Sequence, residues 1–223
     1  MKDVDVRSLS SLPRSERDFL NRAMLEASLS QCGTAVKGLT LDVGCGSRPY
    51  EKTFFSGARR YVGTDYLTDR SRPEIVCGAQ ELPFRDSVFD TVVCTEVLEH
   101  VPDPGLALRE IRRVIKPSGS LILSTPMYWP RHEVPHDYFR YPYDGLLRLL
   151  GESGWEPENL FNRGSSYAML GQVLMHVAPR ALQPRPLVWL LNSFFLWCDR
   201  HRRNDVITMG WTVLARPVNV GAA

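Results

Sequence analysis

The chain has 223 residues, 43% of them hydrophobic, which is enough for one domain with a sizeable core. Its 27 basic and 25 acidic side chains are mixed along the chain and give a formal net charge of +2, so no continuous basic surface for nucleic acid is predicted. Five widely spaced cysteines with no CxxC pair argue against a disulfide framework and a cysteine metal site, and they favour a cytoplasmic protein.

The N-terminal region, residues 1–37, is predicted to be a helical cap on a single domain that spans residues 1–223. Ser15 and Asp18 resemble a helix-start box, and the apolar residues that follow recur at helical spacing, which predicts a helix over 15–30. The first residues include acids and lack the apolar core of a signal peptide, so nothing in them directs export.

Short apolar runs then indicate an α/β fold with a parallel sheet. The runs are LTLDV, RYVGTD, EIVC, FDTVVC and SLILST, and the segments between them can hold helices or turns. The clearest helix follows Asp103, which can cap it, and Pro104, which suits its first turn. A second helix that stops at Gly154, a strand over 155–161 and a last strand over 208–215 complete the pattern.

A helical insert is predicted over residues 162–206, before the last strand. It contains the apolar stretch PLVWLLNSFFLW at 186–197, which is shorter than the ~20 residues that a transmembrane helix needs, so no membrane span is predicted. Arginines flank this stretch. A core helix, peripheral contact with a membrane or a lipid-like substrate, and the face of a homodimer all remain open.

A glycine loop, LDVGCGSRPY at residues 41–50, follows directly after a predicted strand. A dinucleotide fingerprint needs a third glycine at position 49, where this chain has Pro49, and no Walker lysine follows. Asp65 ends the next predicted strand about 20 residues later. In nucleotide-binding folds an acid at this spacing accepts the ribose hydroxyls, so Asp65 could do the same. Gly44 and Gly46 allow a ribose-bearing ligand without a pyrophosphate to approach the backbone closely.

Four ordered segments between residues 38 and 126 resemble the class I methyltransferases that use S-adenosylmethionine, in particular the type 11-like small-molecule group related to quinone biosynthesis. The segments are LDVGCGSRPY, YVGTDY, ELPFRDSVFDTVVCTEVLEHVPDP and IRRVIKPSGSLILSTP. The resemblance implies a Rossmann-like, mostly parallel sheet of seven strands, with an antiparallel last strand and helices on both faces. It implies S-adenosylmethionine as the cofactor, across the carboxyl ends of the first strands.

The resemblance also implies a set of cofactor contacts, and these are Asp42, Gly44, Cys45, Gly46, Asp65, Tyr66, Ala79, Gln80, Thr95 and Glu96. Asp65 would hold the ribose and Tyr66 would pack on the adenine. Where the family often has an acid for the adenine amino group this chain has Gly78, which leaves Ala79 and Gln80 as the adenine contacts. Asp42 would orient the loop or contact the methionine end of the cofactor. Thr95 and Glu96 would border that methionine end.

The segment TPMYWPRHEVPHDYFRYPYDGLLRLL brings aromatic residues close to two histidines and is the predicted acceptor side. Aromatic walls with a few polar groups suit a small, apolar or aromatic organic acceptor. The PHDYFRYP portion resembles methyltransferases from bacterial surface-glycan and secondary-metabolite pathways. An oxygen acceptor of high pKa needs a general base, and the candidates are His136, oriented by Asp137, then His132 and His100.

Four neighbouring residues, His132, Glu133, His136 and Asp137, raise the question of a metal. The two histidines would share a face only on a helix, and Pro130 and Pro135 argue against a helix there, so no metal site is predicted.

The sequence therefore predicts a cytoplasmic enzyme that transfers a methyl group from S-adenosylmethionine to a small molecule, onto oxygen, with nitrogen and carbon acceptors left open. Gly78 and the apolar insert motivate the alternative of a non-catalytic domain of the same fold that binds the cofactor or a partner. Pro49 and the absence of a Tyr-x-x-x-Lys pair disfavour a nicotinamide dehydrogenase.

Overall fold

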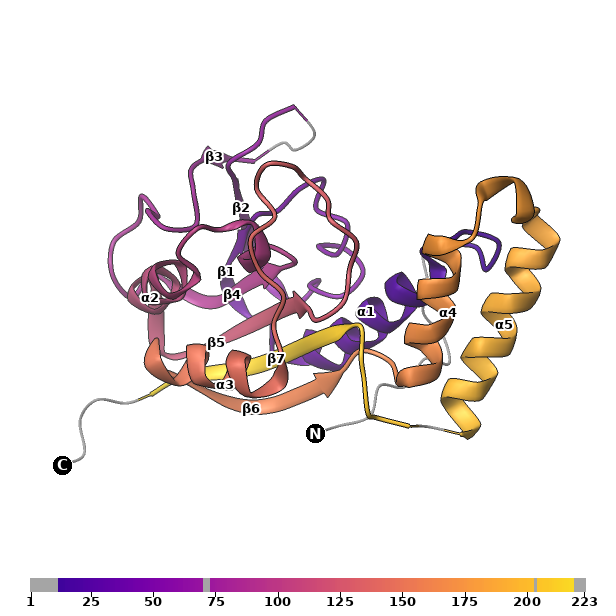
Figure 1. Ribbon diagram of the computed structural model, residues 1–223. Coiled ribbons are helices and arrows are strands. Elements are labelled where there is room, and N and C mark those ends of the chain that lie inside the picture. Colours follow the sequence, from indigo (N-terminus) through magenta and orange to yellow (C-terminus); the bar gives the residue numbers. More distant parts are fainter. Residues whose placement is uncertain (1–11, 70–72, 203, 219–223) are drawn as a thin grey trace.

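The computed structural model describes residues 12–69, 73–202 and 204–218, and a seven-stranded sheet forms the centre of this part (Figure 1). The strands are β1 (Gly38–Val43), β2 (Ala58–Asp65), β3 (Ile75–Val76), β4 (Phe89–Thr95), β5 (Ile115–Pro126), β6 (Trp155–Asn162) and β7 (Gly210–Pro217). Their order is β3-β2-β1-β4-β5-β7-β6. Only β7 runs antiparallel to its neighbours. The predicted Rossmann-like sheet, with its antiparallel last strand between two earlier ones, is confirmed.

The helices follow the sequence signals closely. They are α1 (Phe19–Cys32), α2 (Pro104–Val114), α3 (Tyr143–Glu152), α4 (Ser166–Val177) and α5 (Arg185–His201), with short 3-10 turns η1 (Gly33–Ala35), η2 (Leu98–His100) and η3 (Arg180–Leu182). The Asp103 side chain caps α2 by accepting from the Leu106 amide at 2.8 Å. Helix α1 begins later than predicted, because Asp18 makes no cap bond and its carboxylate contacts Gln172 and His176 instead.

Two apolar layers cover the two faces of the sheet. On one face α2 and α3 pack against strand residues such as Leu41, Val92 and Leu121, all of them fully buried. On the other face α1 packs against Val93 and Ile122. Neighbouring strand residues belong to different layers, as Val92 and Val93 do. Such alternation is expected for a strand whose two faces are both covered.

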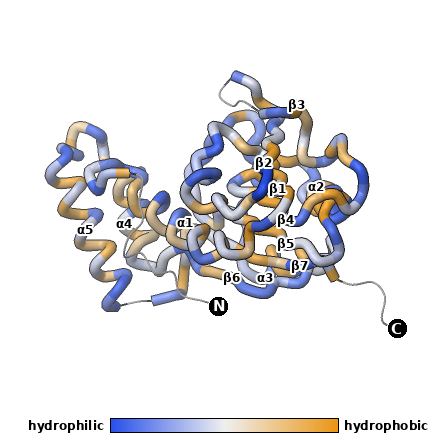
Figure 2. The backbone as a smooth tube through the Cα atoms, turned by 180° about the vertical axis from the view of Figure 1, so that it is seen from behind, coloured by the Kyte–Doolittle hydropathy of each residue, from blue (hydrophilic) through white to orange (hydrophobic). Residues whose placement is uncertain are grey.

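The insert between β6 and β7 extends the α1 side of the molecule. Figure 1 shows α1, α4 and α5 at successively greater distances from the sheet, and Figure 2 shows hydrophobic and hydrophilic stretches mixed along α5. Residues 1–11 of the predicted N-terminal cap and residue 203 of the predicted insert lie outside the described residues. Within the part of the chain that the structure describes, no helix combines the length and the apolar composition that crossing a membrane requires.

Candidate active site

The carboxyl ends of the parallel strands β1, β2, β4 and β5 meet at one edge of the sheet, which is where open parallel sheets bind ligands. We call the turn of the glycine loop (residues 44–48 of the segment 41–50) and the end of β2 the cofactor side. We call Glu96, η2 and the loop over residues 127–142, the acceptor loop, the acceptor side.

The glycine loop is held by backbone hydrogen bonds to the end of β2. The amides of Gly44 and Cys45 donate to the Thr64 carbonyl oxygen at 2.8 and 2.9 Å, and the Gly46 amide donates to Asp65 Oδ2 at 2.8 Å. Gly44 and Gly46 both have positive φ, 70° and 50°. A Cβ on Gly44 would lie 2.4 Å from Val97, whereas a Cβ on Gly46 would meet nothing within 4 Å. Packing therefore requires the first glycine, while the second exposes backbone that a ligand can approach.

The predicted ribose and adenine contacts lie at the end of β2 and after β3, the two strands on one side of β1 in the sheet order. Asp65 ends β2, and its second carboxylate oxygen accepts from the Leu67 amide at 2.9 Å, so the carboxylate is fixed in place. The Tyr66 ring is 69% exposed and has room for a planar group against it. After β3, Ala79 is buried and Gln80 half-buried, and a Cβ on Gly78 would meet only open space. These residues fit a nucleoside on the cofactor side.

Asp42 in β1 is a buried acid directly before the glycine loop. The Tyr61 hydroxyl donates to its Oδ2 at 2.7 Å, and its Oδ1 has no hydrogen-bond partner among the described residues. Burial raises the pKa of Asp42 to about 7, although the Tyr61 hydrogen bond opposes that rise. Burial also raises the pKa of Cys45 to about 11, so Cys45 stays a thiol and offers a ligand its backbone only.

Glu96 was predicted to border the methionine moiety of the cofactor, and it follows the half-buried Thr95 at the end of β4. Its carboxylate makes hydrogen bonds to residues of β5 and of the segment after β6. Its Oε1 accepts from Ser124 Oγ at 2.7 Å and from Arg163 at 2.5 Å. Arg163 is buried, follows β6, and also donates to Asn21 Oδ1 at 2.8 Å. Arg163 was not predicted as a site residue, because its polar surroundings in the sequence NLFNRG do not mark it as buried.

Hydrogen bonds dock the acceptor loop onto η2. His100 Nδ1 donates to the His136 carbonyl oxygen at 2.6 Å, and the Tyr138 amide donates to the Glu99 carbonyl oxygen at 2.8 Å. The buried Tyr141 closes the loop, because its hydroxyl donates to the Leu98 carbonyl oxygen at 2.8 Å. The predicted candidate bases therefore do lie on neighbouring segments at the carboxyl edge of the sheet.

The predicted orientation of His136 by Asp137 is wrong. The Asp137 carboxylate accepts from two Arg140 nitrogens at 2.5 and 2.9 Å and from the His132 amide at 3.0 Å. The hydrogen bonds from Arg140 hold the pKa of Asp137 well below its usual range. His136 is exposed, and its Nδ1 pairs with the Tyr138 hydroxyl at 2.9 Å. His136 closes a turn by donating its amide to the Glu133 carbonyl oxygen at 2.9 Å, and Asp137 after it pairs with Arg140 instead of with His136.

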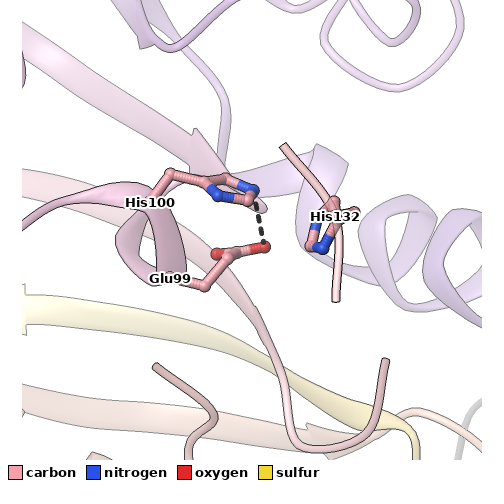
Figure 3. Close-up of side chains that lie close together, drawn as sticks. All are labelled: Glu99, His100 and His132. Carbon is pink, nitrogen blue, oxygen red and sulfur yellow. Dashed lines mark ion pairs between the residues drawn. The ribbon is translucent and has the colours of Figure 1, made fainter. Parts of the chain in front are cut away.

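Glu99, His100 and His132 form a compact group (Figure 3). The rings of the two histidines meet edge to face with centroids 4.6 Å apart, and Glu99 Oε1 lies 3.8 Å from His100 Nε2. Burial raises the pKa of Glu99, with repulsion from Glu96 adding to the rise, and burial lowers the pKa of His132. The sequence analysis did not predict Glu99 as a site residue.

The insert reaches the acceptor loop through His176 on α4. Its ring lies 4.8 Å from the Trp129 ring and 6.2 Å from the Tyr128 ring, centroid to centroid. His176 also pairs with Asp18 at 3.3 Å and with Gln172 at 3.0 Å. The first part of the acceptor loop is therefore supported by α4 and by the residue before α1.

Residues 41–123 match a family model described as a methyltransferase domain. The ubiquinone/menaquinone biosynthesis C-methyltransferase UbiE of Burkholderia mallei is 28% identical over 150 residues, which cover 60% of this chain and 60% of that protein. The same-named protein of Burkholderia thailandensis matches equally, with 28% identity over 150 residues. The chain thus spans 60% of the length of these curated relatives.

Solved structures share the fold. A putative methyltransferase from Bacillus halodurans superposes with a TM-score of 0.56 at 21% identity, covering 86% of this chain and 98% of that one. The 1,6-didemethyltoxoflavin-N1-methyltransferase of Burkholderia thailandensis, solved with S-adenosylhomocysteine, gives 0.57 at 16% identity, covering 88% and 79%. The [4+2]-cyclase SpnF gives 0.54 at 21% identity, covering 88% and 82%. The similarity to a methyltransferase domain therefore covers residues 41–123, and the solved structures share the fold of the described residues.

Proposed function

We propose that this protein transfers a methyl group from S-adenosylmethionine to a hydroxyl oxygen of a small organic acceptor. The observation that carries the proposal is the open backbone at Gly46, beside the fixed carboxylate of Asp65, at the same sheet edge as the histidines of the acceptor side. The resemblance of PHDYFRYP to glycan and secondary-metabolite enzymes supports an acceptor from such a pathway. All five cysteines lie in the described part and are thiols, which supports a role in the cytoplasm.

When bound, S-adenosylmethionine would supply a methyl group on a positively charged sulfur; the acceptor oxygen forms a bond to the methyl carbon as the carbon–sulfur bond breaks, and S-adenosylhomocysteine leaves. In the proposal Asp65 holds the ribose and the open Gly46 backbone lies against the cofactor. Asp42 contributes, at the methionine end, its Oδ1, which has no hydrogen-bond partner among the described residues. The protein's main tasks are to align the two reactants and to exclude water.

A hydroxyl acceptor must lose a proton, and His132 is our first candidate for receiving it. His132 is half-buried, and burial lowers the pKa of its imidazole, which favours the neutral form that can accept a proton near pH 7. His136 and His100 stay as further candidates. His136 is exposed and reaches solvent, while His100 holds the acceptor loop through its Nδ1.

Calorimetry tests the cofactor part of this proposal. Wild type should bind S-adenosylmethionine and S-adenosylhomocysteine with micromolar affinity and should not bind NAD. Asp65→Ala should abolish both interactions, whereas the matched variant of an exposed acid on α3, Asp144→Ala, should bind like wild type. Binding of NAD alone, or of no ligand, would contradict the proposal.

The acceptor atom can be tested with S-adenosylmethionine that carries a 13C-methyl group. Incubation with phenols, sugars and amines should give methoxy carbon signals and no N-methyl or C-methyl signals. The names of the curated relative and of the structural neighbour specify C-methyl and N1-methyl transfer, so either signal would replace the oxygen assignment.

A domain that binds the cofactor without methyl transfer is the second candidate. Gly78 removes the acid expected at the adenine, and one structural neighbour is named a cyclase. This candidate predicts tight cofactor binding with no release of S-adenosylhomocysteine under any acceptor in the screen. Release of S-adenosylhomocysteine with a methylated product would exclude it.

The exposed apolar face of α5 supports an apolar acceptor and contact with a membrane surface. Trp189, Leu190, Phe194 and Trp197 are 49 to 57% exposed. Exposed arginines lie near both ends of the helix, which suits anionic lipid headgroups better than the face of a second copy. We therefore propose peripheral contact with an anionic membrane and treat a homodimer as the competing outcome.

A further inference from the structure

The group formed by Glu99, His100 and His132 contains a buried carboxylate without a close counter-ion. The Glu99 side chain is 1% exposed, and its Oε2 has no hydrogen-bond partner among the described residues. Its Oε1 lies 3.8 Å from His100 Nε2, which is longer than a hydrogen bond. An ionised carboxylate is costly to bury unless a cation compensates it, so without a cation burial favours the protonated form of Glu99, and a bound cation would stabilise its carboxylate.

The histidines present nitrogen atoms to the same point. One ligand atom from each of the three residues lies within 4.8 Å of the other two, and Figure 3 shows the three side chains turned toward one another. In a site with bonds of about 2.1 Å, neighbouring ligand atoms are roughly 3 to 3.5 Å apart. Side-chain rotations that move these atoms by about 1 Å therefore bring all three to a metal.

A hydrogen bond fixes the orientation of His100 from behind, whereas the carboxylate behind the His132 ring lies too far away for a hydrogen bond. His100 Nδ1 donates to the His136 carbonyl oxygen, so in the neutral ring Nε2 keeps its lone pair and faces Glu99 and Glu133, each 3.8 Å away. His132 Nδ1 lies 3.6 Å from Asp137 Oδ2, and the Asp137 carboxylate is itself fixed by Arg140. A carbonyl or carboxylate behind each ring is the usual support of a metal-binding histidine.

We propose that Glu99, His100 and His132 bind a divalent transition-metal ion, with Zn²⁺ as the best match to two imidazoles and one carboxylate. With the ion bound, His132 and His100 are ligands, and His136 is the candidate that is left for receiving the acceptor proton of the proposed function. Glu133, half-exposed and 3.8 Å from His100 Nε2, can approach as a fourth ligand or leave that position to water or to an acceptor oxygen. This site differs from the one excluded by the sequence, because it takes His132 without His136 and adds two residues from η2.

Metal binding can be measured without any methyl transfer. Untagged protein, treated with a chelator and desalted, is titrated with Zn²⁺ by calorimetry, and the metal that remains after gel filtration is counted by mass spectrometry. The proposal predicts about one ion per chain. It also predicts a visible Co²⁺ absorption spectrum of a nitrogen- and oxygen-ligated site. Mg²⁺ at the same concentrations should not compete, because it prefers an all-oxygen site.

Glu99→Gln and His132→Ala should each weaken Zn²⁺ binding at least about 10-fold, the effect expected even for outer-shell changes. The matched control is His136→Ala, which removes an adjacent imidazole but keeps the backbone oxygen that orients His100. Circular dichroism and S-adenosylhomocysteine binding confirm that the variants are folded. Failure of wild type to retain Zn²⁺, or equal binding by wild type, Glu99→Gln and His132→Ala, would overturn the proposal, whatever the outcome for methyl transfer.

Discussion

The two sides of the candidate site are held together by different kinds of contact. On the cofactor side, the amides of Gly44 and Cys45 bond to the Thr64 carbonyl oxygen. On the acceptor side, side chains carry the connections, above all Arg163 with Glu96 and Arg140 with Asp137. Backbone bonds tolerate many side chains, whereas a side-chain network needs particular partners. The comparison suggests that cofactor binding belongs to the fold, while acceptor choice depends on a few buried charges.

Replacement of the central arginine is the strongest test of this difference. Arg163→Met removes the guanidinium from Glu96 and Asn21 and leaves Glu96 its hydrogen bond from Ser124. Because the Glu96 side chain is 28% exposed, the loss in the free energy of unfolding should lie below the value of about 3 to 5 kcal/mol expected for a fully buried ion pair. Urea unfolding measures the loss. The double variant Arg163→Met/Glu96→Gln should recover part of it. A single variant as stable as wild type would show that the acceptor side does not depend on this pair.

The buried acid of the cofactor side should make stability depend on pH. Because the pKa of Asp42 is raised to about 7 in the folded protein, that state holds its proton longer than the unfolded chain does. Stability should therefore fall as pH rises from about 4 to about 7, by up to about 4 kcal/mol. Asp42→Asn should remove this fall and be the more stable protein at pH 8. Unfolding curves of both proteins across this range decide it, and parallel pH dependences would contradict the assignment.

The two glycines of the loop should separate folding from ligand binding. Gly44→Ala forces a Cβ against Val97 and into a left-handed conformation, which should cost about 2 to 3 kcal/mol of stability. Gly46→Ala meets no protein atom within 4 Å, so it should unfold more like wild type but bind S-adenosylhomocysteine at least about 10-fold more weakly. Thermal unfolding and calorimetry on the pair provide the readouts. Equal affinity of Gly46→Ala and wild type would show that the cofactor does not approach this backbone.

The exposed face of α5 should matter for association and hardly at all for folding. Replacing Trp189 and Trp197 together by alanine should change stability by no more than about 0.5 to 1 kcal/mol. The double variant should lose most of its sedimentation with phosphatidylserine vesicles. Leu106→Ala, an exposed leucine on α2, is the control. If wild type ignores vesicles and light scattering shows a dimer that the variant dissociates, the membrane proposal is wrong.

The sequence allowed prediction of the parts that depend on local patterns. The alternation of apolar runs predicted the sheet, Asp103 and Pro104 predicted the start of α2, and the spacing after the glycine loop predicted that Asp65 ends the next strand. Such features involve residues close in sequence or strands whose order the resemblance fixes.

The contacts of the acceptor side could not be predicted in the same way. Arg163 reaches Glu96 across 67 positions of the chain, and His132 meets Glu99 only because an irregular loop folds over η2. Asp137 turned to Arg140 rather than to its neighbour His136, since side-chain direction in a loop depends on its local path. A single sequence carries no periodic signal for pairs of this kind.

The central claim is that the cofactor lies across the glycine loop with its reactive end toward η2. A crystal structure with S-adenosylhomocysteine tests it most directly. We predict ribose hydroxyls within hydrogen-bond distance of Asp65, the Gly46 backbone against the ligand, and the sulfur on the side of Glu96 and His100. A ligand bound elsewhere on the molecule, or one with its sulfur turned away from η2, would contradict the account.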